Sequence, residues 1–108
     1  MSKRILVVDD EADSRRILRD LLASTDYEMT EAVNGEQALA AVAKQRPDLI
    51  LMDIQLPVTD LKSVPIIAVT SYALAGDESK ALAAGCDSYV SKPYSPRELL
   101  AKVRAYLR

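Results

Sequence analysis

The stretch Ile-Leu-Val-Val-Asp-Asp at residues 5–10 joins a continuous apolar run to a pair of acids. An unbroken run rich in β-branched residues is typical of a strand that is covered on both faces, as in a parallel sheet with helices on each side. The two carboxylates follow at the carboxyl end of this strand, where ligands bind in open α/β sheets. These six residues therefore indicate both a fold class and the place of a candidate site.

Short apolar runs alternate with segments of helical period along the rest of the chain. Strands are predicted at residues 27–32, 49–52, 66–69 and 88–91, and helices at 13–23, 36–45, 77–84 and from 95 onward. This alternation predicts an α/β fold built from βα units around a mostly parallel sheet. A chain of 108 residues has the length of one domain, so we expect a single domain over residues 1–108.

Two of the predicted helices carry specific signals. In the first, Ile17, Leu18, Leu21 and Leu22 are expected to form one buried stripe. The last is expected to begin at the segment Ser-Pro-Arg-Glu (95–98), which has the pattern of a capping box with proline at the first helical position.

The composition excludes several classes of chemistry. The chain has no histidine, which rules out imidazole-dependent catalysis and zinc sites of the usual kind, and its single Cys86 cannot form an internal disulfide. A net charge of −2 gives no basic field for nucleic acid or anionic lipid. No apolar run has the length of a signal peptide or a membrane span. We expect a cytoplasmic protein that contacts neither nucleic acid nor membranes directly.

Polar residues follow four of the predicted strands: Asp9 and Asp10, Asp53, Thr70, and Lys92. If these strands are neighbours, three carboxylates meet a hydroxyl and an ammonium at one edge of the sheet. Close carboxylates repel one another unless a cation joins them, and an all-oxygen ligand set suits Mg²⁺. The pattern therefore predicts a magnesium site.

The lone acid Asp53 is the candidate nucleophile toward a phosphoryl group, because Asp forms acyl phosphates. Lys92 and Thr70 are then expected to contact the phosphoryl oxygens by charge and by a hydroxyl hydrogen bond. Taken singly, each residue has an ordinary interpretation: a turn for the acid pair, a helix cap for Thr70, a solvated side chain for Lys92. Their joint occurrence at strand ends favours a site.

These motifs together resemble a response-regulator receiver domain of two-component signalling, as in single-domain chemotaxis and cell-cycle regulators. The resemblance rests on four segments: Val-Asp-Asp-Glu (8–11), Leu-Met-Asp-Ile-Gln-Leu-Pro (51–57), Thr-Ser (70–71) and Lys-Pro (92–93). It implies a doubly wound, flavodoxin-like sheet of five parallel strands in the order 2-1-3-4-5.

The resemblance also implies a function. Asp53 would accept a phosphoryl group from a histidine kinase or a phosphotransfer protein, and the chain would catalyse its own phosphorylation and slow dephosphorylation without being a conventional enzyme. The implied Mg²⁺ ligands are Asp9, Asp10, Asp53 and the backbone carbonyl of Gln55. Thr70 and Tyr89 would form the switch pair, and the peptide bond between Lys92 and Pro93 would be cis. The output would be a protein contact on the surface formed by the helix at 77–84, the strand at 88–91 and the last helix, with homodimerisation left open.

One departure from the family pattern is large. Family members continue after the Pro57 segment into a third helix, whereas here only residues 57–64 separate two predicted parallel strands, too few for a helical crossover. Either the helix is deleted or a segment is missing between Asp60 and Leu61. Its loss is expected to expose three or four apolar side chains of the sheet, which an extended loop, an exchanged element or a neighbouring molecule would have to cover.

Two alternatives from other classes stay open. A receiver-like module that binds a protein partner without being phosphorylated is compatible with the missing helix. A phosphatase with an aspartate nucleophile is weaker, because such enzymes use a second acid two residues after the nucleophile and position 55 is Gln.

Overall fold

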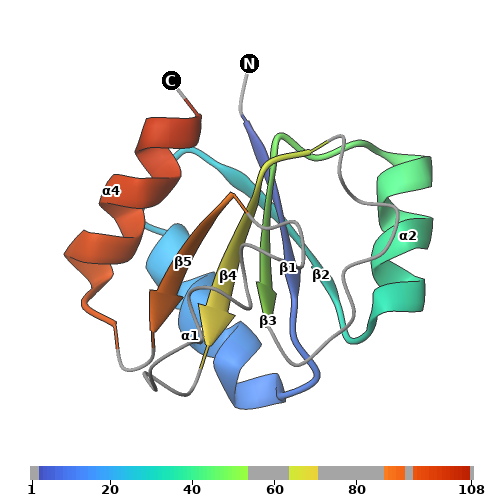
Figure 1. Cartoon of the computed structure of the whole chain (residues 1–108), viewed down its shortest axis with the longest axis horizontal. Coiled ribbons are helices and arrows are strands. Elements are labelled where there is room, and N and C mark those ends of the chain that lie inside the picture. The colour runs from blue at the N-terminus through green and yellow to red at the C-terminus, as the bar shows by residue number, and fades with distance from the viewer. Residues whose placement is uncertain (1–2, 54–63, 71–86, 92–93, 108) are drawn as a thin grey trace.

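A computed structural model of the chain describes residues 3–53, 64–70, 87–91 and 94–107. Its five strands form one parallel sheet in the order β2-β1-β3-β4-β5 (Figure 1). The strands are β1 (Arg4–Val8), β2 (Glu28–Ala32), β3 (Leu49–Asp53), β4 (Ile66–Thr70) and β5 (Ser88–Ser91). The predicted α/β class, the parallel sheet and the strand order are confirmed.

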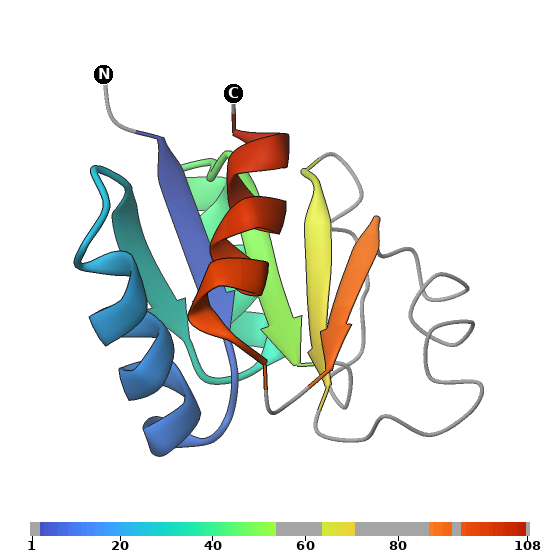
Figure 2. The same cartoon turned by 90° about the vertical axis from the view of Figure 1, so that its left-hand side faces the viewer.

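The described helices lie on both faces of the sheet, as expected for a doubly wound fold. They are α1 (Ala12–Leu22), α2 (Gly35–Lys44) and α4 (Pro96–Tyr106). Figure 2 shows α1 and α4 on one face and α2 on the other. None of these three is both long and apolar enough to cross a membrane. The helix predicted at 77–84 and the junction between Asp60 and Leu61 lie outside the described residues.

The strands alternate their side chains between two apolar clusters, as the strand period requires. Ile5 and Val7 of β1 belong to the cluster that α1 and α4 cover, whereas Leu6 and Val8 belong to the cluster on the α2 side. All four side chains are fully buried. This explains why the first apolar run is continuous: neither face of β1 meets water.

The apolar stripe predicted for α1 is wrong at one position. Leu18 and Leu22 are buried and Leu21 is partly buried, but Ile17 is 57% exposed. Each residue of a helix is rotated by about 100° from the one before, so Ile17 lies on the flank of the helix when Leu18 faces the sheet.

Side chains cap two of the helices. The Oγ of Ser95 accepts a hydrogen bond from the Glu98 amide (3.0 Å), and Pro96 is the first residue of α4, as predicted. The Oδ1 of Asn34 likewise accepts from the Gln37 amide (2.8 Å), while Gln37 accepts from the Val33 amide (3.0 Å). These bonds satisfy amides that a helix start leaves without an intrahelical partner.

The described strands are buried on the α2 side of the sheet, including apolar side chains of the kind that loss of a third helix was expected to leave in need of cover. Ile50 and Met52 of β3 and Ile66 and Ala68 of β4 are each at most 1% exposed. Their cluster includes Val64, which immediately precedes β4 and is itself buried. These described side chains are therefore shielded from solvent within the chain.

Candidate functional site

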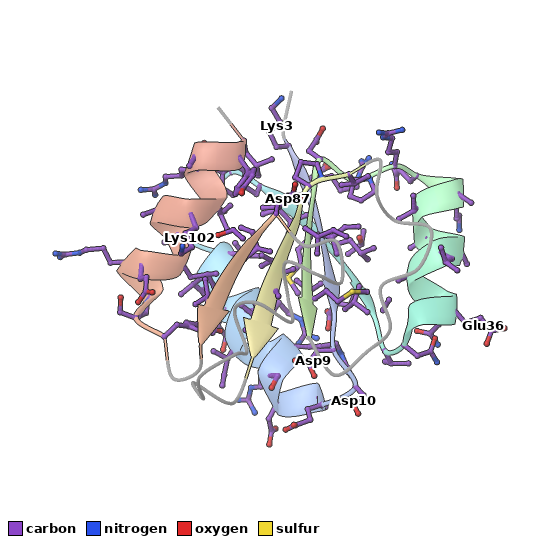
Figure 3. The ribbon with its side chains drawn as sticks, in the orientation of Figure 1. Lys3, Asp9, Asp10, Glu36, Asp87 and Lys102 are labelled. Atoms are coloured by element: carbon purple, nitrogen blue, oxygen red, sulfur yellow. The ribbon has the colours of Figure 1, made fainter. Side chains whose placement is uncertain are left out.

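The parallel register aligns the carboxyl ends of β1, β3, β4 and β5 at one edge of the sheet. Val8 of β1 pairs with Met52 of β3, so Asp9 and Asp53 come next on adjacent strands. Farther along the sheet, Asp53 pairs with Val69, and Thr70 pairs with Ser91. The chain positions of Asp9, Asp53 and Thr70 therefore share one edge. Figure 3 shows Asp9 and Asp10 at this edge and Lys3 and Asp87 at the opposite end.

Asp9 is held closely at the end of β1. Asp9 is only 2% exposed, and among the described residues it is the one charged residue that is buried. Its amide donates to the carbonyl of Ala32 (3.1 Å), which extends the β1–β2 pairing by one residue. Its Oδ1 accepts from the Glu11 amide (2.9 Å), the two-residue turn that Asp side chains commonly form. The turn interpretation of the acid pair is thus correct for one oxygen of Asp9.

The acid pair divides into a buried and an exposed member. Asp10 is exposed, directly beside the buried Asp9. Two adjacent carboxylates at a strand end, with no histidine in the chain, are ligands of the type that a hard divalent cation prefers. Among the described residues no group of three or more Asp, Glu, Cys or His side chains is placed to hold a metal ion. Asp9 and Asp10 supply two oxygen donors of the kind that Mg²⁺ takes.

Sequence reasoning missed the role of Arg15 in α1. Its Nη1 donates to the main-chain carbonyl oxygen of Asp9 at 2.7 Å, and its Nε contacts Oε1 of Glu31 at 3.2 Å. Arg19 also binds both carboxylate oxygens of Glu31, at 2.7–2.9 Å. A network of charged side chains therefore connects α1 and β2 to the backbone of the acid pair.

Tyr94 is a second residue near the acid pair that the sequence did not identify. It is partly buried and packs against the cluster beneath α1 and α4. Burial, together with the negative charge of Asp9, raises the pKa of the Tyr94 phenol above its ordinary value of 10.0. The only sequence signal was its position directly after Lys92 and Pro93.

The remaining predicted site residues are not described at the level of their side chains. The side chains of Asp53, Thr70 and Tyr89, and the whole of Gln55, Lys92 and Pro93, lie outside the described part of the chain. Their roles, the cis peptide and the meeting of the carboxylates around one cation stay predictions.

Comparison with known families assigns the chain to one class of protein. Residues 5–104 match the model of the response regulator receiver domain. The chain belongs to this family. It is thus a receiver domain of two-component signalling, in agreement with the resemblance of its motifs.

Relatives of this receiver domain include single-domain regulators. The polar-differentiation response regulator DivK of Brucella anthropi is 38% identical over 120 aligned positions, which cover 99% of this chain and 98% of DivK. The DivK protein of Brucella ovis is 37% identical over the same length. An alignment of 120 positions is 12 longer than the 108 residues here, so this receiver domain is shorter than DivK by about the length of a helical crossover.

Solved receiver structures have the same fold. A putative response regulator from Chloroflexus aurantiacus superimposes with a TM-score of 0.90 at 28% identity and covers 99% of this chain and 98% of its own. The receiver domain of Ssk1, crystallised with the histidine phosphotransfer protein Ypd1 of Saccharomyces cerevisiae, gives a TM-score of 0.83 at 26% identity, over 97% of this chain and 88% of its own.

Proposed function

We propose that this receiver domain is a phosphorylation-dependent switch or relay, in which Asp53 accepts a phosphoryl group in the presence of Mg²⁺. The observation that carries the proposal is the register of β1 and β3, which sets Asp53 beside the buried Asp9 at the carboxyl edge of the sheet. A carboxylate at a strand end is otherwise common, but a buried one next to a second strand-end acid is the arrangement that a cation-assisted phosphoryl transfer requires.

The proposed reaction moves one phosphoryl group. A carboxylate oxygen of Asp53 attacks phosphorus, a P–O bond forms, and the P–N bond of a phosphohistidine donor breaks. The electron pair of that bond stays on the donor imidazole, which then takes a proton from solvent. Mg²⁺, when bound, neutralises charge on the transferred oxygens. Asp9, Asp10 and the carbonyl of Gln55 are its proposed further ligands.

Lys92 and Thr70 are proposed to contact the phosphoryl oxygens once they are in place. A phosphoryl group brings up to about two negative charges and three acceptor oxygens, which attract an ammonium and a hydroxyl donor. Movement of Thr70 would in turn alter the space open to Tyr89. In the register of β4 and β5, Tyr89 pairs with Ala68, two residues before Thr70. The surface around β5 and α4 would then differ between the two states and serve a downstream protein.

The proposed donor is a histidine kinase or a histidine phosphotransfer protein. Support comes from the structural likeness to the Ssk1 receiver, whose crystal partner Ypd1 is a phosphotransfer protein. These 108 residues contain no histidine, so the donor imidazole lies outside them. We place this reaction in the cytoplasm, in keeping with the composition.

Intact mass after incubation with acetyl phosphate and Mg²⁺ tests this function. The wild-type chain is expected to gain one phosphoryl group and Asp53→Asn none. Asp48→Asn is the matched control, because Asp48 precedes the opposite end of β3, where it binds the Arg4 amide at 2.8 Å. It should gain the group as the wild type does. Labelling of Asp53→Asn would overturn the assignment of the acceptor, and an unlabelled wild type would favour a phosphorylation-independent binding module.

A further inference from the structure

The guanidinium of Arg15 in α1 connects Glu31 of β2 to the backbone of the acid pair. Nη1 donates to the carbonyl of Asp9 at 2.7 Å and Nε to Glu31 at 3.2 Å, so two edges of one planar group are in use. The Arg15 side chain is only 16% exposed. A partly buried, two-sided contact of this kind holds its acceptors more firmly than an exposed ion pair.

The acceptor of this bond is a main-chain atom, which determines what Arg15 controls. The peptide between Asp9 and Asp10 is planar, so fixing the carbonyl of Asp9 also fixes the direction of the Asp10 amide and the position of the Asp10 Cα, from which its side chain extends. On the other side of the same residue, the Asp9 amide is bound to Ala32 at 3.1 Å. Both ends of Asp9 are therefore held, one by β2 and one by Arg15.

Glu31 orients Arg15. It lies on β2 opposite Val7, one residue before the Ala32 that binds Asp9. Arg19 occupies both oxygens of the same carboxylate at 2.7–2.9 Å, but its own side chain is 55% exposed. Both arginines therefore bind Glu31, but the described contact to Asp9 comes from Arg15.

We propose that Arg15 is a positioning residue for the divalent cation: through the carbonyl of Asp9 it sets the two carboxylates of the acid pair in the geometry that binds Mg²⁺. This inference rests on the proposed function, since it concerns the same cation site. Arg15 is not itself a proposed ligand of the cation. Glu31 orients it through the bond to its Nε.

Positioning and simple electrostatics predict opposite results for this residue. A positive charge close to a cation site repels the cation, so by charge alone the loss of Arg15 tightens Mg²⁺ binding. If Arg15 acts by holding the backbone, its loss weakens binding despite the removal of a like charge. Arg15→Lys separates the effects further, because it keeps the charge and loses the planar two-sided contact.

The experiment measures the Mg²⁺ dissociation constant from amide chemical shifts of the wild type, Arg15→Met and Arg15→Lys. Arg19→Gln is the matched control, because it removes an arginine of the same helix that also binds Glu31 but has no described contact to Asp9. Hydrogen exchange of the Glu11 amide without Mg²⁺ is the second measurement, since this amide donates to Oδ1 of Asp9. It reports the order of the acid pair in the absence of any ligand.

We expect Arg15→Met to raise the dissociation constant about 10-fold, the range typical of groups that orient metal ligands, and Arg15→Lys to raise it less. Exchange at Glu11 should be faster in both. Arg19→Gln should leave the constant unchanged or slightly lower. Unchanged or tighter binding in Arg15→Lys, which retains the charge and the fold, overturns the inference. Absence of Mg²⁺ binding in the wild type overturns the proposed function itself, and the inference with it.

Discussion

Val8 of β1 and Met52 of β3 are direct partners in the parallel register, so Asp9 and Asp53 continue on adjacent strands at the same edge of the sheet. Asp9 is buried, and hydrogen bonds hold its backbone on both sides: its amide donates to Ala32, and its carbonyl accepts from Arg15. The proposed chemistry depends on this proximity, because the cation and the nucleophilic carboxylate have to lie close together.

Asp9→Asn should weaken Mg²⁺ binding by about 10-fold or more, since the substitution removes a charged oxygen ligand and keeps the size of the side chain. The amide oxygen of Asn still accepts the Glu11 bond, so the turn should survive. A titration followed by amide shifts measures the change, with the exposed Asp26→Asn as the control. Equal affinities in the two variants would show that Asp9 is not a ligand.

The raised pKa of Tyr94 makes a pH-dependent prediction. Because the folded pKa lies above the unfolded value of 10.0, folding favours the neutral phenol, and this contribution is present below pH 10 and lost as the pH rises through the folded pKa. Unfolding free energy measured in urea should therefore fall with pH in this alkaline range, and less steeply in Tyr94→Phe.

The same phenol reports on Asp9. Asp9→Asn should lower the pKa of Tyr94 but leave it above 10.0, because burial is the larger of the two causes. Titration of the Tyr94 ring resonances by NMR measures both values. A Tyr94 pKa that does not change in this variant would mean that the two side chains are not coupled.

Leu18→Ala and Ile17→Ala should differ strongly in stability although the residues are adjacent. Leu18 is 2% exposed and Ile17 is 57% exposed. We expect a loss of about 2–5 kcal/mol in the free energy of unfolding for the first and about 0.5 kcal/mol or less for the second. Urea denaturation measures both, and equal losses would contradict the described orientation of α1.

Ser95→Ala should destabilise the chain by about 1 kcal/mol, because the Glu98 amide loses the hydroxyl that caps the start of α4. Ser24→Ala is a suitable control, since the Ser24 hydroxyl only donates to the Leu21 carbonyl at an exposed position. Its effect should stay within about 0.5 kcal/mol. Chemical denaturation of both variants gives the comparison, and a smaller loss for Ser95→Ala than for Ser24→Ala would be inconsistent with the cap.

The strands and their order were predictable because their signals are local and repeated. Three apolar runs buried on both faces, at residues 5–8, 49–52 and 66–69, indicated the parallel sheet, and Ser95 with Pro96 indicated the start of the last helix. The family motifs then supplied the strand order that local patterns leave open. The limits of the described helices and strands agree with the predictions within a few residues, the usual latitude at element ends.

Contacts between distant residues were not predictable in the same way. The exposure of Ile17 depends on which flank of α1 meets the sheet, and the bond from Arg15 to Asp9 depends on a side-chain direction that spacing does not fix. The burial of Ile66 and Ala68 shows the same limit, because it depends on what packs over the sheet rather than on the strand itself. The influence of the Asp9 charge on the pKa of the Tyr94 phenol likewise emerges only from the fold.

The most direct test of the central claim is an amide chemical-shift map of the wild type with Mg²⁺ and beryllofluoride, a mimic of the phosphoryl group. We expect large shifts at residues 9–11, at Asp53, at Thr70 and at 89–92, and their loss in Asp53→Asn. Shifts absent from these strand ends, or unchanged in Asp53→Asn, would contradict it.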